Sequence, residues 1–192
     1  MATVALVTGS SSRGIGRGIV KALAGEHRVV IHGLEDISVL DAIATDLNDQ
    51  LGFGGGNERQ RRVFAVSGDI RDDAICQRIV RDVQSRFGSL DVLVNNAGCQ
   101  HVAPIVNFPT GEYERIVDTI LKSTWLMTKY ALPSMLENKW GRIINTGSMH
   151  ATVSRLNDLP TAHRLPTDSV FRCRWPRRTN RRTMRQSTAC WA

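Results

Sequence analysis

The string TGSSSRGIG, from Thr8 to Gly16, constrains the fold more than any other feature of this chain. It follows a short apolar run at residues 4–7 and opens an amphipathic segment, so a strand, a glycine-rich turn and a helix are expected in succession. Glycine lets the backbone turn tightly and approach a pyrophosphate, which the free N–H groups of the helix N-terminus can bind. The string therefore predicts a dinucleotide-binding turn, although the glycines could also serve tight turning alone.

The pattern of apolar residues beyond this turn predicts a doubly wound α/β fold. Strands are predicted at residues 3–8, 28–32, 63–66, 90–94 and 142–145. Helices are indicated by Ile15, Ile19 and Leu23 as a buried stripe, by Val39, Leu40, Ile43, Leu47 and Leu51, and by Ile75, Ile79, Val83 and Phe87. Such βα units in series form a parallel sheet covered on both faces, here with the strand order 3-2-1-4-5. A long helix is predicted over 111–138, which Pro133 should kink or divide.

Length and composition favour one soluble domain. The 192 residues contain no apolar run near the roughly 20 residues of a membrane span, and no signal peptide opens the chain. The four cysteines lack metal-ligand spacing, so reduced structural thiols and no metal site are expected. We expect a cytoplasmic protein that does not contact membranes.

The charge is concentrated in the last part of the chain. Residues 1–154 contain 16 Lys or Arg and 16 Asp or Glu, so the net charge of +7 comes from the remaining residues. We interpret 1–153 as an incomplete Rossmann-type domain, cut after its fifth strand, and 154–192 as a basic irregular tail from a shifted reading frame or aberrant splice. A nucleic-acid-binding arm is the less favoured alternative.

Four motifs occur in the order and at about the spacing of the short-chain dehydrogenase/reductase family, which the chain resembles over residues 2–153. They are the glycine turn, Asp69 after the third strand, NNAG at residues 95–98, and GRIINTGS ending at Ser148. Within the family, the stretch 95–150 is similar to D-3-hydroxybutyrate dehydrogenases. The resemblance implies reversible hydride transfer between a nicotinamide cofactor and a small 3-hydroxy or 3-keto acid.

The resemblance also implies a set of cofactor residues. Gly9, Gly14, Ile15 and Gly16 would bind the pyrophosphate, Asp69 the adenine, and Asn96, Ala97 and Gly98 the ribose and nicotinamide. Four residues separate Gly9 from Gly14 where the family usually has three, so the turn should bulge.

The choice between NAD and NADP depends on two side chains. Glu35, just past the second strand, could accept a hydrogen bond from the ribose 2′-hydroxyl of NAD. Arg13 could bind the 2′-phosphate of NADP. The resemblance favours NAD, while a solvated surface role remains open for either side chain.

Substrate and catalytic roles are implied for three residues. Ser148 matches the serine that hydrogen-bonds the reacting carbonyl oxygen, and Gln100 and His150 match positions that contact a substrate carboxylate.

The general acid/base pair of the family, a Tyr with a Lys four residues later, is missing. The expected positions hold Thr161 and Leu165, and Ile120 occupies the place of the family's helix Asn. The chain's tyrosines, Tyr113 and Tyr130, both precede Ser148 and lack that Lys. The alternative to a dehydrogenase is therefore an inactive nucleotide-binding fragment. We also expect an impaired family-type homo-oligomer, an unpaired edge at residues 142–145, and exposure of Leu121, Trp125 and Leu132 on the long helix.

Overall fold

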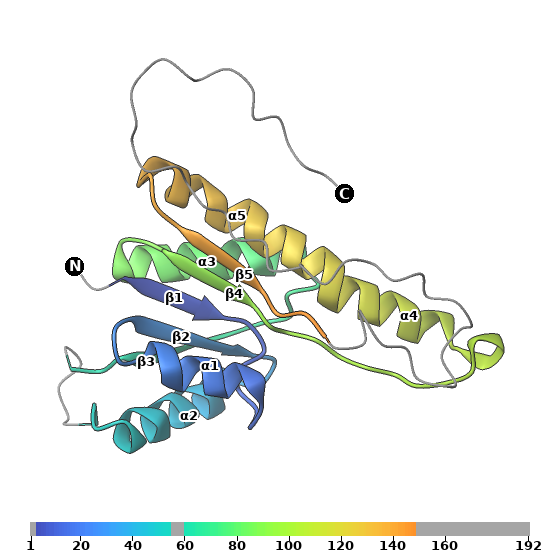
Figure 1. The fold of residues 1–192 in the computed structure, drawn as a ribbon, viewed down its shortest axis with the longest axis horizontal. Coiled ribbons are helices and arrows are strands. Elements are labelled where there is room, and N and C mark those ends of the chain that lie inside the picture. The colour runs from blue at the N-terminus through green and yellow to red at the C-terminus, as the bar shows by residue number, and fades with distance from the viewer. Residues whose placement is uncertain (1–2, 55–59, 149–192) are drawn as a thin grey trace, which may run out of the picture.

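Five parallel strands form one sheet in the computed structural model, which describes residues 3–54 and 60–148 (Figure 1). The strands are β1 (Val4–Val7), β2 (Arg28–Gly33), β3 (Val63–Ser67), β4 (Val92–Asn95) and β5 (Arg142–Asn145). Their order across the sheet is β3-β2-β1-β4-β5, with every pair parallel. The predicted fold class and strand order are confirmed, with strand bounds that shift by two residues or fewer.

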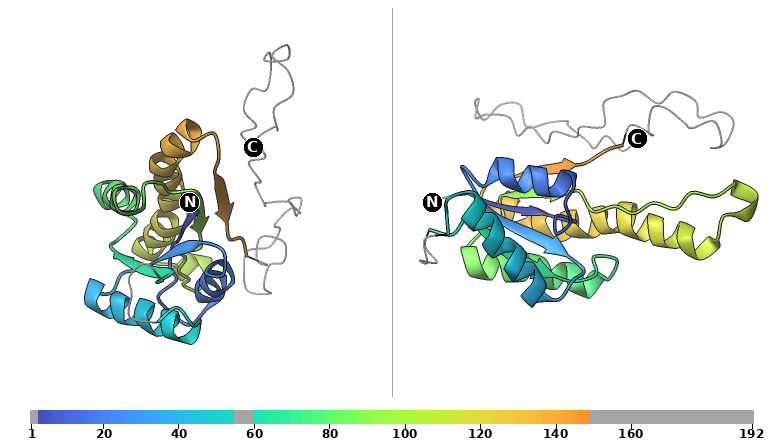
Figure 2. Two further views of the ribbon diagram at one scale, coloured as in Figure 1. Left: turned by 90° about the vertical axis from the view of Figure 1, so that its left-hand side faces the viewer. Right: turned by 90° about the horizontal axis from the view of Figure 1, so that it is seen from below.

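Helices cover both faces of this sheet, as the views in Figure 2 show. The α-helices are α1 (Ile15–Leu23), α2 (Ile37–Gln50), α3 (Asp73–Phe87), α4 (Thr110–Val117) and α5 (Ser123–Glu137). A 3₁₀ turn, η1 (Ile105–Asn107), precedes α4, and a π-helical turn, η2 (Asp118–Lys122), joins α4 to α5. Helices α1 and α2 pack on one face, whereas α3 and α5 pack on the other.

Alternate residues of each inner strand supply the two apolar cores. Val4 and Leu6 of β1 face the core under α3 and α5, and Ala5 and Val7 face the core under α1 and α2. All four side chains are buried, because strand side chains alternate between faces and a parallel sheet is covered on both.

The first helix buries only part of the stripe that the sequence predicts, because Ile19 and Leu23 pack against the core while Ile15 does not. Ile15 is 70% exposed, and the buried positions of α1 and its cap are Gly16, Val20 and Ala24. The predicted stripe is therefore wrong at Ile15 and confirmed at Ile19 and Leu23, and the fully buried positions lie one residue beyond each of the three. Gly16 faces inward because only a residue without a side chain fits there: a Cβ would lie 2.5 Å from the Asn96 side chain.

The predicted long helix is present as α4, η2 and α5 in continuous succession. Pro133 lies inside α5, which continues to Glu137, so the expectation that Pro133 could divide the helix is wrong. A proline removes one backbone hydrogen bond, and α5 is also held by the packing of Leu126, Met127 and other buried residues against the sheet. The irregular turn lies earlier, at η2. Leu121 of η2 and Trp125 and Leu132 of α5 are exposed, as expected.

Within the two described ranges, no helix is both long and apolar enough to cross a membrane. The basic segment 154–192, and with it the predicted domain boundary, lies outside the described residues.

Candidate cofactor site at the carboxyl edge of the sheet

A cleft opens where β1, β2, β3 and β4 end, and the predicted cofactor residues meet there. Six of them line it: Gly9, Glu35, Asp69, Asn96, Ala97 and Gly98. They come from four separate loops, and the parallel sheet brings these loops to one edge. In open α/β sheets this edge is the usual place for a ligand, at the point where the strand order reverses.

The turn after β1 has the close contacts that explain its glycines. Gly9 has a φ of +61°, and a Cβ there would lie 2.7 Å from the Ala97 backbone. Gly14 is different, because a Cβ there would meet no other residue within 4 Å. It precedes α1 as the N-cap residue and makes no side-chain capping bond. The first turn of α1 is therefore free of the capping side chain that helix N-termini often carry.

Thr8 and Asn96 join the turn after β1 to the loop after β4. The Asn96 side-chain amide donates to the carbonyl oxygens of Thr8 and Gly9, each at 3.0 Å. In return, the Thr8 hydroxyl accepts from the backbone N–H groups of Asn96 and Ala97, also at 3.0 Å. These bonds fix the relative position of the two loops, because a shift of either loop would break several of them.

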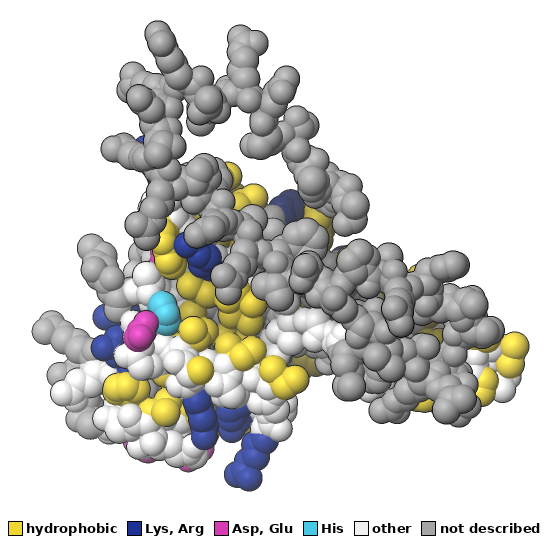
Figure 3. Space-filling view, viewed as in Figure 1, with side chains coloured by type: hydrophobic (Ala, Val, Ile, Leu, Met, Phe, Trp, Pro, Cys, Tyr) yellow, Lys and Arg dark blue, Asp and Glu magenta, His cyan; other side chains and the backbone are white. Residues whose placement is uncertain are grey.

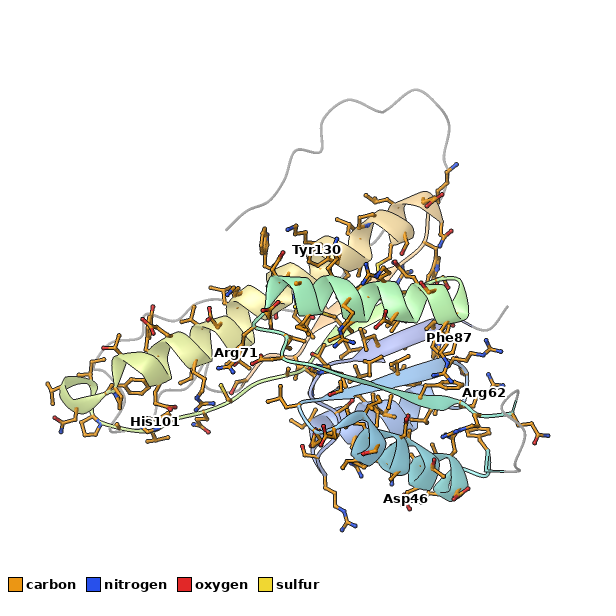
Figure 4. All side chains as sticks on the ribbon, turned by 180° about the vertical axis from the view of Figure 1, so that it is seen from behind. Asp46, Arg62, Arg71, Phe87, His101 and Tyr130 are labelled. Atoms are coloured by element: carbon orange, nitrogen blue, oxygen red, sulfur yellow. The ribbon has the colours of Figure 1, made fainter. Side chains whose placement is uncertain are left out.

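Glu35 and Asp69 place two ionised carboxylates in the cleft. Burial raises the pKa of Glu35, but hydrogen bonds from its own backbone and from the Ser11 hydroxyl, 2.8 Å away, lower the pKa below its usual value overall. Hydrogen bonds from the Arg71 side chain lower the pKa of Asp69 against a smaller effect of burial. The two guanidinium contacts to Asp69 Oδ2 measure 2.5 and 3.0 Å. Arg71 also lines the cleft, and Figure 4 labels it between the sheet and the long helix.

Three neighbours of the cofactor residues were not predicted. Ser11 and Arg71 engage the two carboxylates, and the buried His32 of β2 contacts the Gly9 turn. For His32, the available signal was a titratable residue near the end of an otherwise apolar strand. Ser11 and Arg71 carry no comparable signal, because both belong to polar loops whose paths depend on the fold.

Four predicted cofactor residues, Arg13, Gly14, Ile15 and Gly16, are not among those that line this cleft. Arg13 and Gly14 line a separate basic hollow with Arg17 and Lys21 of α1 and with Asp46 of α2. Glu35 and Arg13, the two side chains weighed for cofactor choice, are therefore in different surface depressions. Ile15 exposes its side chain, so any contribution to binding would come from its backbone.

The predicted substrate residues are only partly described. Ser148 is exposed three residues beyond β5, and Gln100 is exposed in the loop before η1. Neither is among the described residues that line the cleft. His150, Thr161 and Leu165 lie outside the described residues.

The two tyrosines have other surroundings. Tyr130 donates to the Asp73 carboxylate of α3 at 2.8 Å (Figure 4). Tyr113 is 61% exposed on α4.

Cys76 is a buried thiol on helix α3. Burial raises the pKa of the Cys76 thiol to about 12, and the thiol donates to the Ile70 carbonyl oxygen. Such a thiol stays protonated near neutral pH. Among residues 3–54 and 60–148, no group of three or more His, Cys, Asp or Glu side chains could hold a metal ion.

A comparison with known families identifies the fold. The model of the short chain dehydrogenase family matches residues 3–158. The chain belongs to this family. The short-chain dehydrogenase resemblance seen in the sequence is therefore confirmed, and the Gly9 turn, Asp69 and Asn96 lie within the matched region.

Similar proteins are found among both curated relatives and solved structures. The chain is 42% identical to a D-beta-hydroxybutyrate dehydrogenase of Cupriavidus necator over 151 residues, which are 78% of this chain and 54% of that protein. It is 34% identical to a D-beta-hydroxybutyrate dehydrogenase of Rhizobium meliloti, over 80% of this chain and 57% of that one. A short-chain dehydrogenase structure from Streptomyces avermitilis aligns with a TM-score of 0.69 and 30% identity, over 82% of this chain and 53% of that one. The chain thus spans about half the length of the relatives it matches.

Proposed function

We propose that this chain binds NAD in the cleft at the carboxyl edge of the sheet, as the cofactor-binding part of an oxidoreductase. The observation that carries the proposal is the convergence of Gly9, Asp69 and Asn96, with Glu35, on one cleft of a short-chain dehydrogenase fold. Dehydrogenases of this family use NAD or NADP, so a nicotinamide dinucleotide is the cofactor to test first.

The residues present fit such a cofactor. The uncapped N-terminus of α1 beside Gly14 offers backbone N–H groups and a positive dipole end to the pyrophosphate. The close approach of Gly9 to Ala97 keeps side-chain atoms out of the same region. Asp69 would contact the adenine, and Asn96, Ala97 and Gly98 would lie beside the ribose and nicotinamide.

Glu35 supports NAD rather than NADP. Its lowered pKa keeps the carboxylate ionised near neutral pH, so it can accept from a ribose 2′-hydroxyl and would repel a 2′-phosphate. Arg13 would have to leave its own hollow to neutralise that phosphate.

The reaction class that we propose for the family chemistry is the interconversion of a small 3-hydroxy acid and its 3-keto acid. When bound, the nicotinamide supplies hydride-transfer chemistry. The Ser148 hydroxyl would donate to the substrate oxygen, while Gln100 and His150 would orient the carboxylate. The two hydroxybutyrate dehydrogenases among the relatives support this substrate class.

We further propose that the chain as written binds the cofactor without efficient turnover. A Tyr at position 161 and a Lys at position 165 would move the proton, but these positions hold Thr161 and Leu165. Within the 192 residues, neither Tyr113 nor Tyr130 is followed by Lys at the fourth position.

Calorimetric titration of the purified chain with NAD and NADP tests the binding proposal. We expect about millimolar binding of NAD, equivalent to about −4 kcal/mol, and weaker binding of NADP. Glu35→Gln should reduce the preference for NAD, because the amide no longer repels a 2′-phosphate. Arg13→Ala is the matched control and should leave the preference unchanged. A preference for NADP that disappears in Arg13→Ala would reverse the assignment.

A further inference from the structure

A titratable side chain is buried directly against the glycine turn. His32 lies near the carboxyl end of β2 and is 2% exposed. Its Nδ1 lies 3.2 Å from the backbone nitrogen of Gly9, and its Nε2 lies 2.8 Å from the carbonyl oxygen of Gly68. The imidazole ring therefore connects the turn after β1 with the loop after β3 that carries Asp69.

These two contacts are compatible with one protonation state only. The Gly9 N–H can only donate, so Nδ1 must accept, and the Gly68 carbonyl can only accept, so Nε2 must carry the proton. A neutral ring with its proton on Nε2 satisfies both groups. A doubly protonated ring would present an N–H to the Gly9 N–H, and the two donors would repel each other.

The backbone of His32 holds the same turn. Its carbonyl oxygen accepts from the Ser10 N–H at 2.9 Å, and its N–H donates to the Ser10 hydroxyl oxygen at 3.1 Å. The His32 ring adds a third hydrogen bond, which it accepts from the Gly9 N–H. Gly9 is the residue of this turn that has a left-handed backbone conformation. The position of the turn relative to β2 thus depends on three hydrogen bonds from one residue.

We propose that His32 is a positioning residue for the nucleotide, which sets the conformation of the Gly9 turn through its neutral, Nε2-protonated ring. This inference rests on the proposed function, because it assumes that the Gly9 turn binds the nucleotide. It goes beyond that function by assigning the control of affinity to the buried His32 ring, which contacts the backbone of the turn.

The electrostatic surroundings favour the neutral ring near neutral pH. Burial lowers the pKa of His32 below its usual value, against the opposing effects of the Gly68 carbonyl and of the Glu35 and Asp69 carboxylates. Glu35 follows β2 and Asp69 follows β3, while the turn at residues 9–12 contains no charged side chain. Both carboxyl groups have lowered pKa values, so they are ionised near neutral pH.

Two substitutions test the two hydrogen bonds of the His32 ring one at a time. The Oδ1 atom of asparagine occupies about the place of a histidine Nδ1, so His32→Asn keeps an acceptor for Gly9 and loses the donor to Gly68. The Nε2 atom of glutamine occupies about the place of a histidine Nε2, so His32→Gln keeps the donor and loses the acceptor. Neither side chain titrates near neutral pH.

The experiment measures NAD affinity by calorimetry from about pH 8 down to about pH 5, the range in which histidine titrates. At the upper pH we expect His32→Asn to bind within about threefold of the original chain and His32→Gln to bind about tenfold more weakly, as for one lost hydrogen bond. Affinity of the original chain should fall toward the lower pH, whereas that of His32→Asn should stay level. His27→Asn, at the far end of β2, is the control and should keep the original pH profile.

Nuclear magnetic resonance of the original chain with ¹⁵N-labelled histidine tests the tautomer without nucleotide or substitution. We expect His32 to be neutral with its proton on Nε2 at about pH 7, and the Gly9 amide signal to shift when the ring gains a proton.

A proton on Nδ1, or a charged ring at that pH, would overturn the proposal even if the variants fail to fold. Equal affinity of His32→Gln and the original chain, or identical pH profiles for the original chain and His32→Asn, would also overturn it. Absence of nucleotide binding by the original chain would instead refute the proposed function, because the tautomer is measured separately.

Discussion

The two edge strands of the sheet, β3 and β5, differ in how their outward-facing backbone groups are hydrogen-bonded. At one edge, three of the outward-facing backbone groups of β3 are bonded by side chains of the same chain. Asn48 of α2 accepts from the Val63 N–H at 3.0 Å and donates to the Val63 carbonyl oxygen at 2.8 Å. Arg78 of α3 donates to the Ser67 carbonyl oxygen at 2.7 Å. These contacts occupy the positions that an additional strand would use, which is how natural sheets protect an edge.

Among the described residues, the opposite edge, at β5, is paired on its inner side only. Arg142 and Thr146 donate backbone hydrogen bonds toward β4, so the intervening alternate residues Ile143 and Asn145 direct their N–H and C=O groups outward. β5 is the last strand of the described sheet on this side. Apolar side chains gather where β5 crosses the molecule (Figure 3), and Ile144 and Trp140 are 42% and 40% exposed.

The candidate site shows a similar difference between residues that follow β1, β2 and β3 and the residue that follows β5. Gly9, Glu35 and Asp69, which belong to the loops after β1, β2 and β3, are held by hydrogen bonds to buried or half-buried neighbours. Ser148, beyond β5, is exposed. The proposed cofactor side therefore has supporting contacts from within the described chain, whereas Ser148 on the proposed substrate side is exposed.

The largest expected effect concerns turnover on the substrate side. With D-3-hydroxybutyrate and NAD, NADH formation by the chain as written should not exceed that of Ser148→Ala, because the missing acid/base pair would supply about 10²- to 10⁴-fold. Absorbance of NADH measures the rate. Turnover within about tenfold of a typical enzyme, about 1 to 10³ per second, would contradict the prediction and remove the functional difference between the two sides.

Asn48 should contribute most to the closed edge. Asn48→Ala leaves the Val63 N–H and C=O groups and the Arg62 N–H without their partner, so we expect about 2–4 kcal/mol lower stability to urea. Asn48→Asp keeps the acceptor for both N–H groups and should also show whether the donor matters. Asn138→Ala on the exposed end of α5 is the control, with a change within about 0.5 kcal/mol. Equal stability of Asn48→Ala and the control would refute the role of Asn48.

The open edge should promote self-association as salt rises. The nine arginines in residues 155–192 repel one another at low ionic strength, and salt screens that repulsion. Light scattering should therefore show larger species at physiological salt, and Ile144→Lys should reduce them. Val39→Lys on α2 changes a side chain of similar exposure, 48%, on the other side of the molecule and should have little effect. A monomer at both salt concentrations would contradict this prediction.

The smallest expected effect is a pH dependence of stability on the cofactor side. The pKa of His32 is lower in the folded chain than its ordinary value of 6.5, so the unfolded chain takes up the proton first as pH falls. Stability associated with neutral His32 is thus present above about pH 6.5 and decreases as pH falls toward the folded pKa. Thermal unfolding should show a lower midpoint at mildly acidic pH in the original chain than in His32→Asn, each compared with its own value at neutral pH. An equal decrease of the thermal midpoint in both proteins would contradict the assignment of this pH dependence to His32.

The sequence predicts the sheet well because apolar runs and glycine turns are local signals. Strand order and the meeting of Asp69 with Asn96 and Gly9 follow from the parallel βα topology. The buried face of α1 could not be predicted from spacing alone, since the close approach of Gly16 to Asn96 turns Ile15 outward. The roles of Asn48 and Arg71 also depend on loops that come together only in the fold, which periodicity does not describe.

Amide hydrogen exchange with and without NAD tests most directly whether the cofactor side is the functional part of this chain. We predict slower exchange on adding NAD in the loops at residues 8–16, 33–35, 68–71 and 95–98, with little change in β5. NAD-dependent protection confined to β5, or no protection in any of the four loops at saturating NAD, would contradict the account.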